Sequence, residues 1–362
     1  MTLKGFLQVF GIIAVLMTLI PLIAADFWWI RIFDYLHIQL TLLTLTAIAA
    51  YFIRFDIKRV EDYVFMVVLL GCFFFQVIKI YPYFPHDNYE VGEVSEENFT
   101  NKFSLYAANV LQKNKNPKKL IADIKKQNPD VLLFTETNTR WKEDLSVITD
   151  TYPYKIEVPL DNTYGMLFYS RLKLKKPRIS YLVDDSIPSI HSVLELRSGK
   201  DIMFHAIHPT PPMPQHNPSS TARDAEMMKI AFMAKDSRLP VVVAGDFNDV
   251  AWSATTALFQ NVGGLLNTRV GRGFYNSFDA TSSIMRWSLD HIFVTEEFRV
   301  ADFKLGSDID SDHFPIYIEL NLEPDKAEEQ KPKPPTKEEL KDAREQIRNL
   351  EEKAKEELKK KN

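Results

Sequence analysis

The sequence predicts a layered α/β domain that follows three membrane-spanning helices and precedes a charged helix. In roughly the first 80 residues the apolar runs carry almost no charge, whereas from about 99 to 322 short apolar runs alternate with polar or helix-like segments. After residue 323 the chain becomes rich in Lys and Glu. Because 46% of the 362 residues are apolar, the chain carries ample material for a core.

Three uncharged runs predict the membrane helices, which we place at about 6–25, 35–53 and 63–81. Each run is close to the roughly 20 residues that cross a bilayer, and Lys79 in the third can extend its ammonium group to the headgroups. Two alternatives stay open. The first run could be a signal peptide cleaved near Ala25, and the other two could form a buried soluble hairpin.

Basic residues next to these runs predict the orientation. Lys4 precedes the first run, and Arg54, Lys58 and Arg59 separate the second from the third, whereas the first loop has only Arg31 beside two Asp residues. Positive charge favours the cytoplasmic side. We therefore expect a multi-pass protein of the cell membrane, with the chain after residue 81 on the extracytoplasmic side, periplasmic or extracellular.

The rest of the chain divides into three parts. Segment 82–98 contains Pro, Gly and several Glu, which predicts an exposed spacer. The domain at 99–322 has no net charge, which weakens a nucleic-acid-binding reading without excluding it. The only cysteine, Cys72, lies in the third apolar run, so this domain has no disulfide and no cysteine metal site.

The elements of the domain follow in a regular order. Strands are predicted at FSLYAANV, DVLLFTE, GMLFYS, HSVLELRS, DIMFHAIH, PVVVAGDFN, LDHIFV and FPIYIEL, and helices at PKKLIADIKKQ and RDAEMMKIAFMA. Some strands follow each other directly, as in hairpins, and others are joined through helices. This pattern indicates a layered α/β fold with mixed sheets.

The tail at 323–362 begins with the stiff break KPKPP. Thr336 and Glu339 then form a predicted capping box for a helix at 337–360. Apolar residues recur every three or four positions, but only over about two heptads. We favour a solvated, charged helix over a coiled coil, with weak self-association through this helix as the alternative.

Polar side chains recur at or just past the ends of the predicted strands. Ends of core strands are where α/β folds assemble their sites. Each residue alone has an ordinary explanation, such as a helix cap, a polar turn or a surface pair. The residues are Asn109, Glu136, His208, Asp246, Asn248, Asp290, His291, Asp312 and His313.

The section between Asn261 and Trp287, GGLLNTRVGRGFYNSFDATSSIMRW, resembles membrane-attached bacterial members of the endonuclease/exonuclease/phosphatase superfamily, and six motifs taken together resemble the superfamily as a whole. They are NVL at Asn109, TET at Glu136, HPTPP at His208, GDFND at Asp246, SLDHIFV at Asp290 and SDHFPI at Asp312, in the order found in that superfamily. The resemblance covers about 220 residues and leaves out the apolar runs and the tail. It implies a four-layer α/β sandwich, with two packed mixed β-sheets flanked by helices, and a hydrolase acting on phosphoric ester bonds.

The resemblance also implies roles that agree with the chemistry of these residues. Glu136, Asn109 and Asp312 would form an all-oxygen site for Mg²⁺, with Mn²⁺ or Ca²⁺ as substitutes. Asp246 would orient and deprotonate the attacking water, and Asn248 would hold a phosphate oxygen. His313 would donate to the phosphoryl group while Asp290 fixes its tautomer.

Further residues are expected around the site. His208 would act from the other side of the phosphate, as the second histidine of the superfamily, but the acid that accompanies it in DNase I-like members has no obvious equivalent. Asn162 or Tyr164 could replace that acid. Arg272, between Gly271 and Gly273, could approach an anionic substrate, as could Arg269 and Arg286.

These observations predict a membrane-tethered, divalent-metal-dependent phosphohydrolase that cleaves a phosphodiester through attack of an activated water. The substrate could be a nucleic acid or a phospholipid headgroup. The alternative is a noncatalytic scaffold that binds a phosphorylated ligand. The set of acids and histidines argues against the scaffold, because simple binding does not need all of them.

Overall fold

The computed structural model describes residues 2–23, 26–95, 99–213 and 218–361. The chain forms two compact units. One contains Met1–Phe84 with Pro212–Ser220, and the other contains Pro85–Pro211 with Thr221–Asn362.

The first unit is helical. Helix α1 (Leu3–Leu19) continues into η1 (Ile20–Ile23), and α4 (Val60–Ile80) continues into η2 (Tyr81–Tyr83). These two are long and apolar enough to cross a membrane, and α2 (Trp28–Tyr35) with α3 (His37–Phe52), bent by 73°, makes a third candidate if the pair is one span. The described helices thus offer two or three of the expected spans. Residues 24 and 25, at the end of the first predicted run and at its possible cleavage site, lie outside the described residues.

Two contacts inside this unit join polar side chains from different helices. Nζ of Lys4 lies 2.5 Å from Oδ2 of the buried Asp62, and Nε2 of Gln76 donates to Oγ1 of Thr18 at 2.5 Å. Large apolar side chains such as Phe52 (69% exposed) instead face outward. An apolar exterior with paired polar groups inside is the arrangement that a lipid environment favours.

The second unit contains two six-stranded sheets, ordered β11-β12-β1-β2-β4-β3 and β5-β6-β7-β8-β10-β9. Most neighbouring strands are antiparallel, but β1 pairs with β2 in parallel and β7 pairs with β8 in parallel. The strands are β1 (Lys102–Asn109), β2 (Val131–Thr135), β3 (Tyr154–Val158), β4 (Met166–Ser170), β5 (Lys173–Ser180), β6 (Ser189–Glu195), β7 (Asp201–Ile207), β8 (Val241–Asp246), β9 (Leu266–Asn267), β10 (Asp290–Val294), β11 (Phe298–Leu305) and β12 (Ile316–Leu322).

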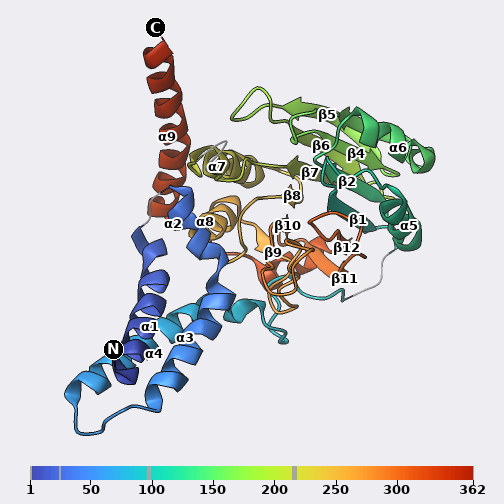
Figure 1. The fold of residues 1–362 in the computed structure, drawn as a ribbon. Coiled ribbons are helices and arrows are strands. Elements are labelled where there is room, and N and C mark those ends of the chain that lie inside the picture. Colours follow the sequence, from blue (N-terminus) through green and yellow to red (C-terminus); the bar gives the residue numbers. More distant parts are fainter. Residues whose placement is uncertain (1, 24–25, 96–98, 214–217, 362) are drawn as a thin grey trace. The chain divides into compact units, whose positions relative to one another are not determined.

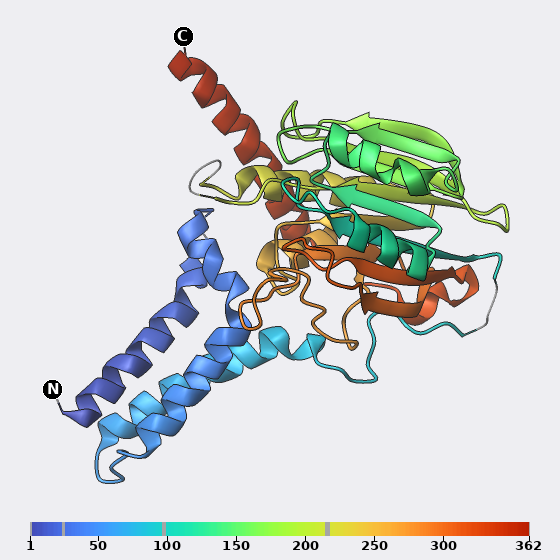
Figure 2. The same ribbon diagram turned by 45° about the vertical axis from the view of Figure 1, so that its right-hand side comes forward.

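The sheets pack face to face with helices on their outer faces, as Figures 1 and 2 show. The central core joins both sheets, for example through Phe168 and Phe204, whose ring centroids are 5.1 Å apart. Helices α5 (Lys118–Gln127) and α6 (Thr139–Thr149) cover the first sheet. The second sheet is covered by α7 (Thr221–Lys235), α8 (Ala254–Gly263) and α9 (Lys337–Lys361). The expected four-layer sandwich is therefore confirmed.

The segment after the apolar helices differs from an exposed spacer over residues 85–93. The backbone N–H of His86 donates to the carbonyl of Gly271 at 2.8 Å, and that of Val300 donates to Gly92 at 3.0 Å. The side chain of Val91 is fully buried in the central core. Proline and charge suggested exposure, but backbone hydrogen bonds and one apolar anchor hold this stretch against the second unit. The spacer residues 96–98 lie outside the described residues.

Helix α9 uses its apolar stripe within its own unit. Leu340, Ala343 and Ile347 join the core between α7, α8 and the second sheet, and Ala343 is fully buried. The capping box is present, since the N–H of Thr336 donates to Oε2 of Glu339 at 2.7 Å and the N–H of Glu339 donates to Oγ1 of Thr336 at 3.2 Å. The early part of the stripe therefore packs internally, and is not available to form a coiled coil with a second chain.

Candidate active site

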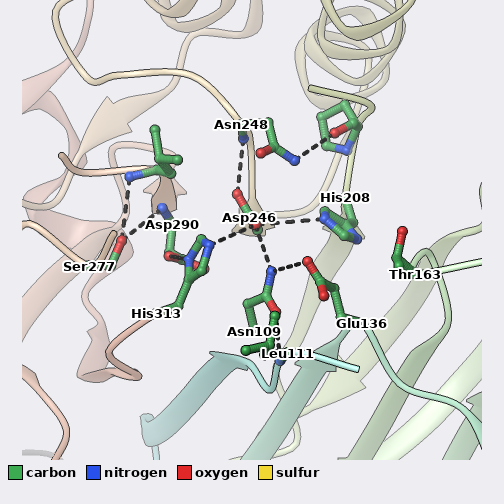
Figure 3. Close-up of polar contacts among 12 residues, drawn as sticks. Asn109, Leu111, Glu136, Thr163, His208, Asp246, Asn248, Ser277, Asp290 and His313 are labelled. Atoms are coloured by element: carbon green, nitrogen blue, oxygen red, sulfur yellow. Dashed lines mark hydrogen bonds and ion pairs between the residues drawn. The ribbon is translucent and has the colours of Figure 1, made fainter. Parts of the chain in front are cut away.

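Strand pairing brings the predicted polar residues to one edge of the two sheets. Asn109 ends β1 opposite Thr135, so that Glu136 follows on the neighbouring parallel strand. In the other sheet, Asp246 at the end of β8 pairs with Asp290 at the start of the antiparallel β10. Because β1 and β8 contact each other across the sandwich, these side chains meet, as Figure 3 shows.

Glycine at position 245 makes this meeting possible. Gly245 has φ +147°, a conformation that L side chains rarely adopt, and a Cβ atom there would lie only 1.9 Å from the carbonyl oxygen of Ile207. A side chain at this position would push β8 away from β7 just before Asp246. The glycine of the GDFND motif is therefore required by close strand packing.

Asp246 lies at the centre of the cluster and is 1% exposed. Its Oδ2 accepts a hydrogen bond from Nδ2 of Asn109 at 3.0 Å, and its Oδ1 accepts from the backbone N–H of Asn248 at 3.0 Å. Nε2 of His208 and Nε2 of His313 lie 3.6 and 3.7 Å from the same Oδ2 (Figure 3). Burial raises the pKa of the Asp246 carboxyl, while the two histidines oppose this shift.

Asp290 and His313 form a hydrogen-bonded pair beside Asp246. Nδ1 of His313 lies 2.7 Å from Oδ2 of Asp290, which leaves Nε2 directed toward Asp246. Burial alone would lower the pKa of His313, but the carboxylates of Asp290 and Asp246 outweigh it and raise the pKa to about 10. Burial works to raise the pKa of Asp290, but its interactions with His313 and Ser277 more than offset this and lower the pKa. The pair is therefore an imidazolium held by a carboxylate at neutral pH.

His208 has a different environment. Its Nδ1 is buried and has no hydrogen-bond partner in the described part of the chain, and its ring centroid lies 5.3 Å from that of Tyr164. The Asn162 side chain does not reach it, because its Nδ2 donates to the carbonyl of Ser186 at 2.9 Å and its Oδ1 accepts from the N–H of Tyr164 at 3.1 Å. Of the two residues considered as partners for His208, the structure brings only Tyr164 close.

Asn248 has φ 51° and follows Asp246 in a tight turn. Its Nδ2 donates to the carbonyl of Pro209 at 3.0 Å, on the loop that follows His208. This bond ties the turn after β8 to the loop after β7. The bond to Pro209 fixes the plane of the Asn248 amide beside Asp246, and it thereby fixes the direction of the second N–H of Nδ2.

Glu136 and Asp312 carry oxygen ligands of the kind that hard cations prefer, whereas Oδ1 of Asn109 accepts from the backbone N–H of Leu111 at 3.0 Å. Nδ2 of Asn109 donates to Oε1 of Glu136 at 3.0 Å, and Oε2 of Glu136 accepts from the N–H of Gln112 at 3.3 Å. Burial raises the pKa of Asp312, with His313 opposing and Glu136 reinforcing the shift. A cation beside Asp312 would offset this shift. The carboxylate oxygens of Glu136 and Asp312 are donors that fit a divalent metal.

Another group of residues meets the distance requirement for a metal site. Ligand atoms of Asp246, Asp290 and His313 lie within 4.8 Å of one another, and all three residues are buried. However, Nδ1 of His313 is already bonded to Asp290. The His313 nitrogen that faces Asp246 is therefore Nε2, 3.7 Å from Oδ2 of Asp246, where it can donate a hydrogen bond or a proton.

The turn that carries Asp246 and Asn248 is fixed from α7, a feature that the sequence analysis missed. Nη1 of Arg223 lies 3.3 Å from Oδ1 of Asp249 and donates to the carbonyl of Asn248 at 2.8 Å. Oδ2 of Asp249 in turn accepts from Oγ of Ser253 at 2.6 Å, just before α8 begins at Ala254. Asp249 therefore shapes the turn and the start of α8.

Arg269 is part of the same support and not an exposed arginine. It is 1% exposed, its Nη1 lies 2.6 Å from Nδ1 of His291, and its Nη2 donates to the carbonyl of Asp290 at 2.7 Å. Because the guanidinium can only donate, Nδ1 of His291 accepts, and its Nε2 donates to the carbonyl of Asp249 at 2.8 Å. His291 is thus a neutral spacer between Arg269 and the turn.

Arg272 and Arg286 are not brought to Asp246. The Arg272 guanidinium lies 4.2 Å from the ring centroid of Tyr89, and its Nη1 donates to the carbonyl of Thr268 at 3.2 Å. Arg286 lies over the ring of Phe314 at 5.1 Å. As expected, Gly271 lets the Arg272 loop pack closely against another part of the chain. That part is segment 86–89 and not the surroundings of Asp246.

Comparison with known proteins identifies the fold and the family. The chain resembles two solved structures of TDP2 from D. rerio. One is humanized by 14 mutations (18% identity, TM-score 0.52) and one is complexed with single-strand DNA product (18%, 0.53); each alignment covers 61% of this chain and 99% of the other. A functionally unknown protein from Enterococcus faecalis matches with 15% identity and TM-score 0.50, over 61% and 100% of the two chains. At these identities the likeness shows the fold.

No curated protein sequence matches the chain. The sequence model of the Endonuclease/Exonuclease/phosphatase family, in contrast, matches residues 106–313, which is more than half of the chain. The match spans Asn109, Asp246 and His313 and agrees with both the resemblance and the enzyme class expected from the motifs. This chain belongs to the Endonuclease/Exonuclease/phosphatase family, whose members are hydrolases of phosphoric ester bonds.

Proposed function

We propose that the chain is a membrane-tethered, divalent-metal-dependent phosphohydrolase that cleaves a phosphodiester. The observation that carries this proposal is the arrangement around Asp246. One buried carboxylate lies within 3.7 Å of two imidazole nitrogens and accepts a 3.0 Å hydrogen bond from Asn109. This arrangement can bind a tetrahedral phosphate, remove a proton from water and stabilise negative charge on oxygen.

In the proposed reaction Asp246 is the general base. Its Oδ accepts a proton from water as the water oxygen forms a bond to phosphorus and the bond to the leaving oxygen breaks. The raised pKa of Asp246 makes the carboxylate a stronger proton acceptor than an exposed aspartate. The leaving oxygen takes up one proton from solvent, equivalent to the one that Asp246 removed and later releases, so that the products are an alcohol and a phosphate monoester.

The two histidines and Asn248 bind the phosphoryl group in this proposal. Nε2 of His313, protonated because its pKa is raised to about 10, donates to a non-bridging oxygen. Asp290 holds the His313 ring and its charge. Nδ2 of Asn248 and the His208 ring act on the remaining oxygens, so that negative charge is met from several directions.

A divalent cation fits beside these residues, and we assign it to Glu136, Asn109 and Asp312. Mg²⁺ is the metal we propose, with Mn²⁺ or Ca²⁺ as possible replacements. When bound, the cation supplies positive charge that neutralises the phosphate oxygens. Support comes from Asp312, because burial and the Glu136 charge raise the pKa of its carboxyl, and a cation would offset this shift.

The tether and its orientation are part of the proposal. Two to three apolar helices could span a membrane by length and composition. Lys4 and the basic residues Arg54, Lys58 and Arg59 favour a cytoplasmic location for the amino terminus and for the loop before α4. With this orientation the catalytic unit would lie on the extracytoplasmic side. Protease added outside intact cells should then digest residues 99–322. Full protection of these residues would contradict the orientation.

The first experiment uses the full chain in detergent with a chromogenic phosphodiester. We expect hydrolysis with Mg²⁺ or Mn²⁺, loss of activity on chelation and recovery when metal is returned. Glu136→Gln should abolish the metal response, whereas Glu143→Gln, an exposed glutamate of α6, should keep it. Binding of substrate without hydrolysis under all metal conditions would instead favour the noncatalytic scaffold.

The second experiment compares substrates under the same conditions. Duplex DNA, single-stranded DNA, RNA, sphingomyelin and phosphatidylinositols all carry phosphate esters that the proposed chemistry can attack. We expect one of these classes to be cleaved at least about tenfold faster than the chromogenic diester, because binding of remote substrate parts adds to transition-state stabilisation. Equal, slow cleavage of all of them would place the physiological substrate outside this panel.

A further inference from the structure

A pocket lies in the unit of the two sheets, away from Asp246. It has a volume of about 460 Å³, and its lining includes His86, Tyr89, Glu93, Arg272, Tyr275 and Asp302. None of the residues that surround Asp246 contributes to it. Its walls come from segment 85–93, from the loop before β10 and from β11, so three separate stretches of chain must meet to form it.

Gly271 holds two of these stretches together. Its φ is +81°, and a Cβ atom there would lie 2.8 Å from Cδ1 of Tyr89 and 3.0 Å from the carbonyl oxygen of Asn88. The N–H of His86 donates to its carbonyl at 2.8 Å. On the opposite wall, the rings of Tyr275 and Phe303 pack edge to face with centroids 4.4 Å apart. Fixed backbone and aromatic contacts therefore shape this pocket.

Arg272 is the cation of the pocket. Its guanidinium lies over the ring of Tyr89, and its one acceptor in the described part of the chain is the carbonyl of Thr268, at 3.2 Å from Nη1. A guanidinium has five N–H donors, so most of its capacity is unused. Burial lowers the pKa of Arg272, which shows that its charge is partly removed from water. Such a cation favours a ligand with anionic oxygens.

Carboxylates that line the same pocket restrict which kind of anion can bind there. Asp87, Glu93 and Asp302 line it. Asp302 is paired with Lys304 at 2.6 Å, whereas no ion pair is formed by Asp87 or Glu93 within the described ranges. A simple anion on Arg272 would be repelled by Glu93. A ligand that also carries a positive group would bring that group to Glu93 and satisfy both charges.

We propose that this pocket binds a zwitterionic phosphate ester, with its phosphate on Arg272 and its ammonium group near Glu93. Phosphoethanolamine has this chemistry, and the same group occurs free and as a phospholipid headgroup. The aromatic walls of Tyr89 and Tyr275 suit the short carbon chain between the two charges. This site is separate from the proposed hydrolytic reaction and does not depend on it.

Calorimetric titration of the full chain in nonionic detergent with phosphoethanolamine tests the proposal. We expect saturable binding that Arg272→Gln weakens at least about tenfold and Glu93→Gln weakens in the same direction. Arg286→Gln, a matched arginine outside the pocket, should leave it unchanged. His313→Ala should also bind normally, so a failure of the hydrolytic assignment and a failure of this one are distinguishable.

Inorganic phosphate and ethanolamine, titrated alone, should each bind much more weakly than phosphoethanolamine. Equal binding of inorganic phosphate, an unchanged affinity in Arg272→Gln, or no binding at all would overturn the proposal. Hydrogen exchange of residues 269–275 in nanodiscs separates the two sources. If residues 269–275 exchange more slowly when phosphatidylethanolamine replaces phosphatidylglycerol in the nanodisc, the ligand is a lipid headgroup. If their exchange slows only when soluble phosphoethanolamine is added, the ligand is the free ester.

Discussion

Nδ1 of His313 lies 2.7 Å from Oδ2 of Asp290, and the side chains are only 5% and 4% exposed. In this environment the carboxylate outweighs burial and keeps the imidazole charged, with a pKa of about 10. The same bond fixes which ring nitrogen faces Asp246. One contact therefore sets both the charge and the direction of the proposed phosphate donor.

Replacing Asp290 by Asn should change the pH dependence of hydrolysis. Loss of the carboxylate charge lowers the pKa of His313, so the decline of kcat/KM on the alkaline side should move to lower pH. We also expect kcat/KM at neutral pH to fall by roughly 10²-fold or more. A pH–rate profile of the full chain measures both effects. An unmoved alkaline limb would show that His313 does not act as the charged donor.

The same pair should affect stability at high pH. The His313 pKa is raised above its usual value of 6.5 to about 10. Its stabilising contribution is therefore complete below about pH 6.5 and is lost as pH rises toward 10. The difference in thermal unfolding temperature between the unmodified chain and Asp290→Asn should shrink over this window. A difference that stays constant from pH 6.5 to 10 would contradict the linkage.

Arg223→Met should destabilise the second unit and disturb the turn after β8. The substitution removes the ion pair between Arg223 of α7 and Asp249, which is 1% exposed. Breaking one partner of a buried pair costs about 3–5 kcal/mol. Arg238→Met, at an exposed arginine, is the matched control and should change little. Denaturant unfolding of the two variants checks the difference, and equal stabilities would remove Arg223 from its supporting role.

Gly245→Ala should prevent correct packing of β8. The new Cβ would lie 1.9 Å from the carbonyl oxygen of Ile207, and the backbone at φ +147° disfavours any side chain. Gly199→Ala is the control, because Gly199 also has positive φ but no atom within 4 Å of the added Cβ. We expect Gly199→Ala to fold with a loss of about 1 kcal/mol and Gly245→Ala to give little folded protein, as judged by yield and circular dichroism. Similar yields would show that the strands can separate at no great cost.

The residues that sequence reasoning grouped are those at strand ends. Asn109, Glu136, Asp246, Asp290 and His313 could be grouped because apolar strands predict an edge and the motifs supply the order. Arg223 could not be linked to this edge. Nothing near it in sequence reveals that α7 packs over the second sheet and directs a guanidinium into the turn at Asp249.

Arginines were the hardest residues to place from sequence. Arg269, Arg272 and Arg286 share a glycine-containing region and looked alike as anion-binding residues, yet one is buried against His291, one lies over Tyr89 and one over Phe314. Their positions depend on which distant segments pack against the loop. Strand order likewise depends on long-range pairing, such as that of β1 with β12, which periodicity does not encode.

The kcat/KM of Asp246→Asn for a phosphodiester, compared with that of the unmodified full chain, tests the central claim most directly. The Asn side chain keeps the shape of Asp246 but cannot accept the proton of the attacking water. We predict a fall of at least about 10³-fold, with no change in Asp185→Asn, an exposed aspartate. Activity of Asp246→Asn within a few-fold of the unmodified chain would contradict the account.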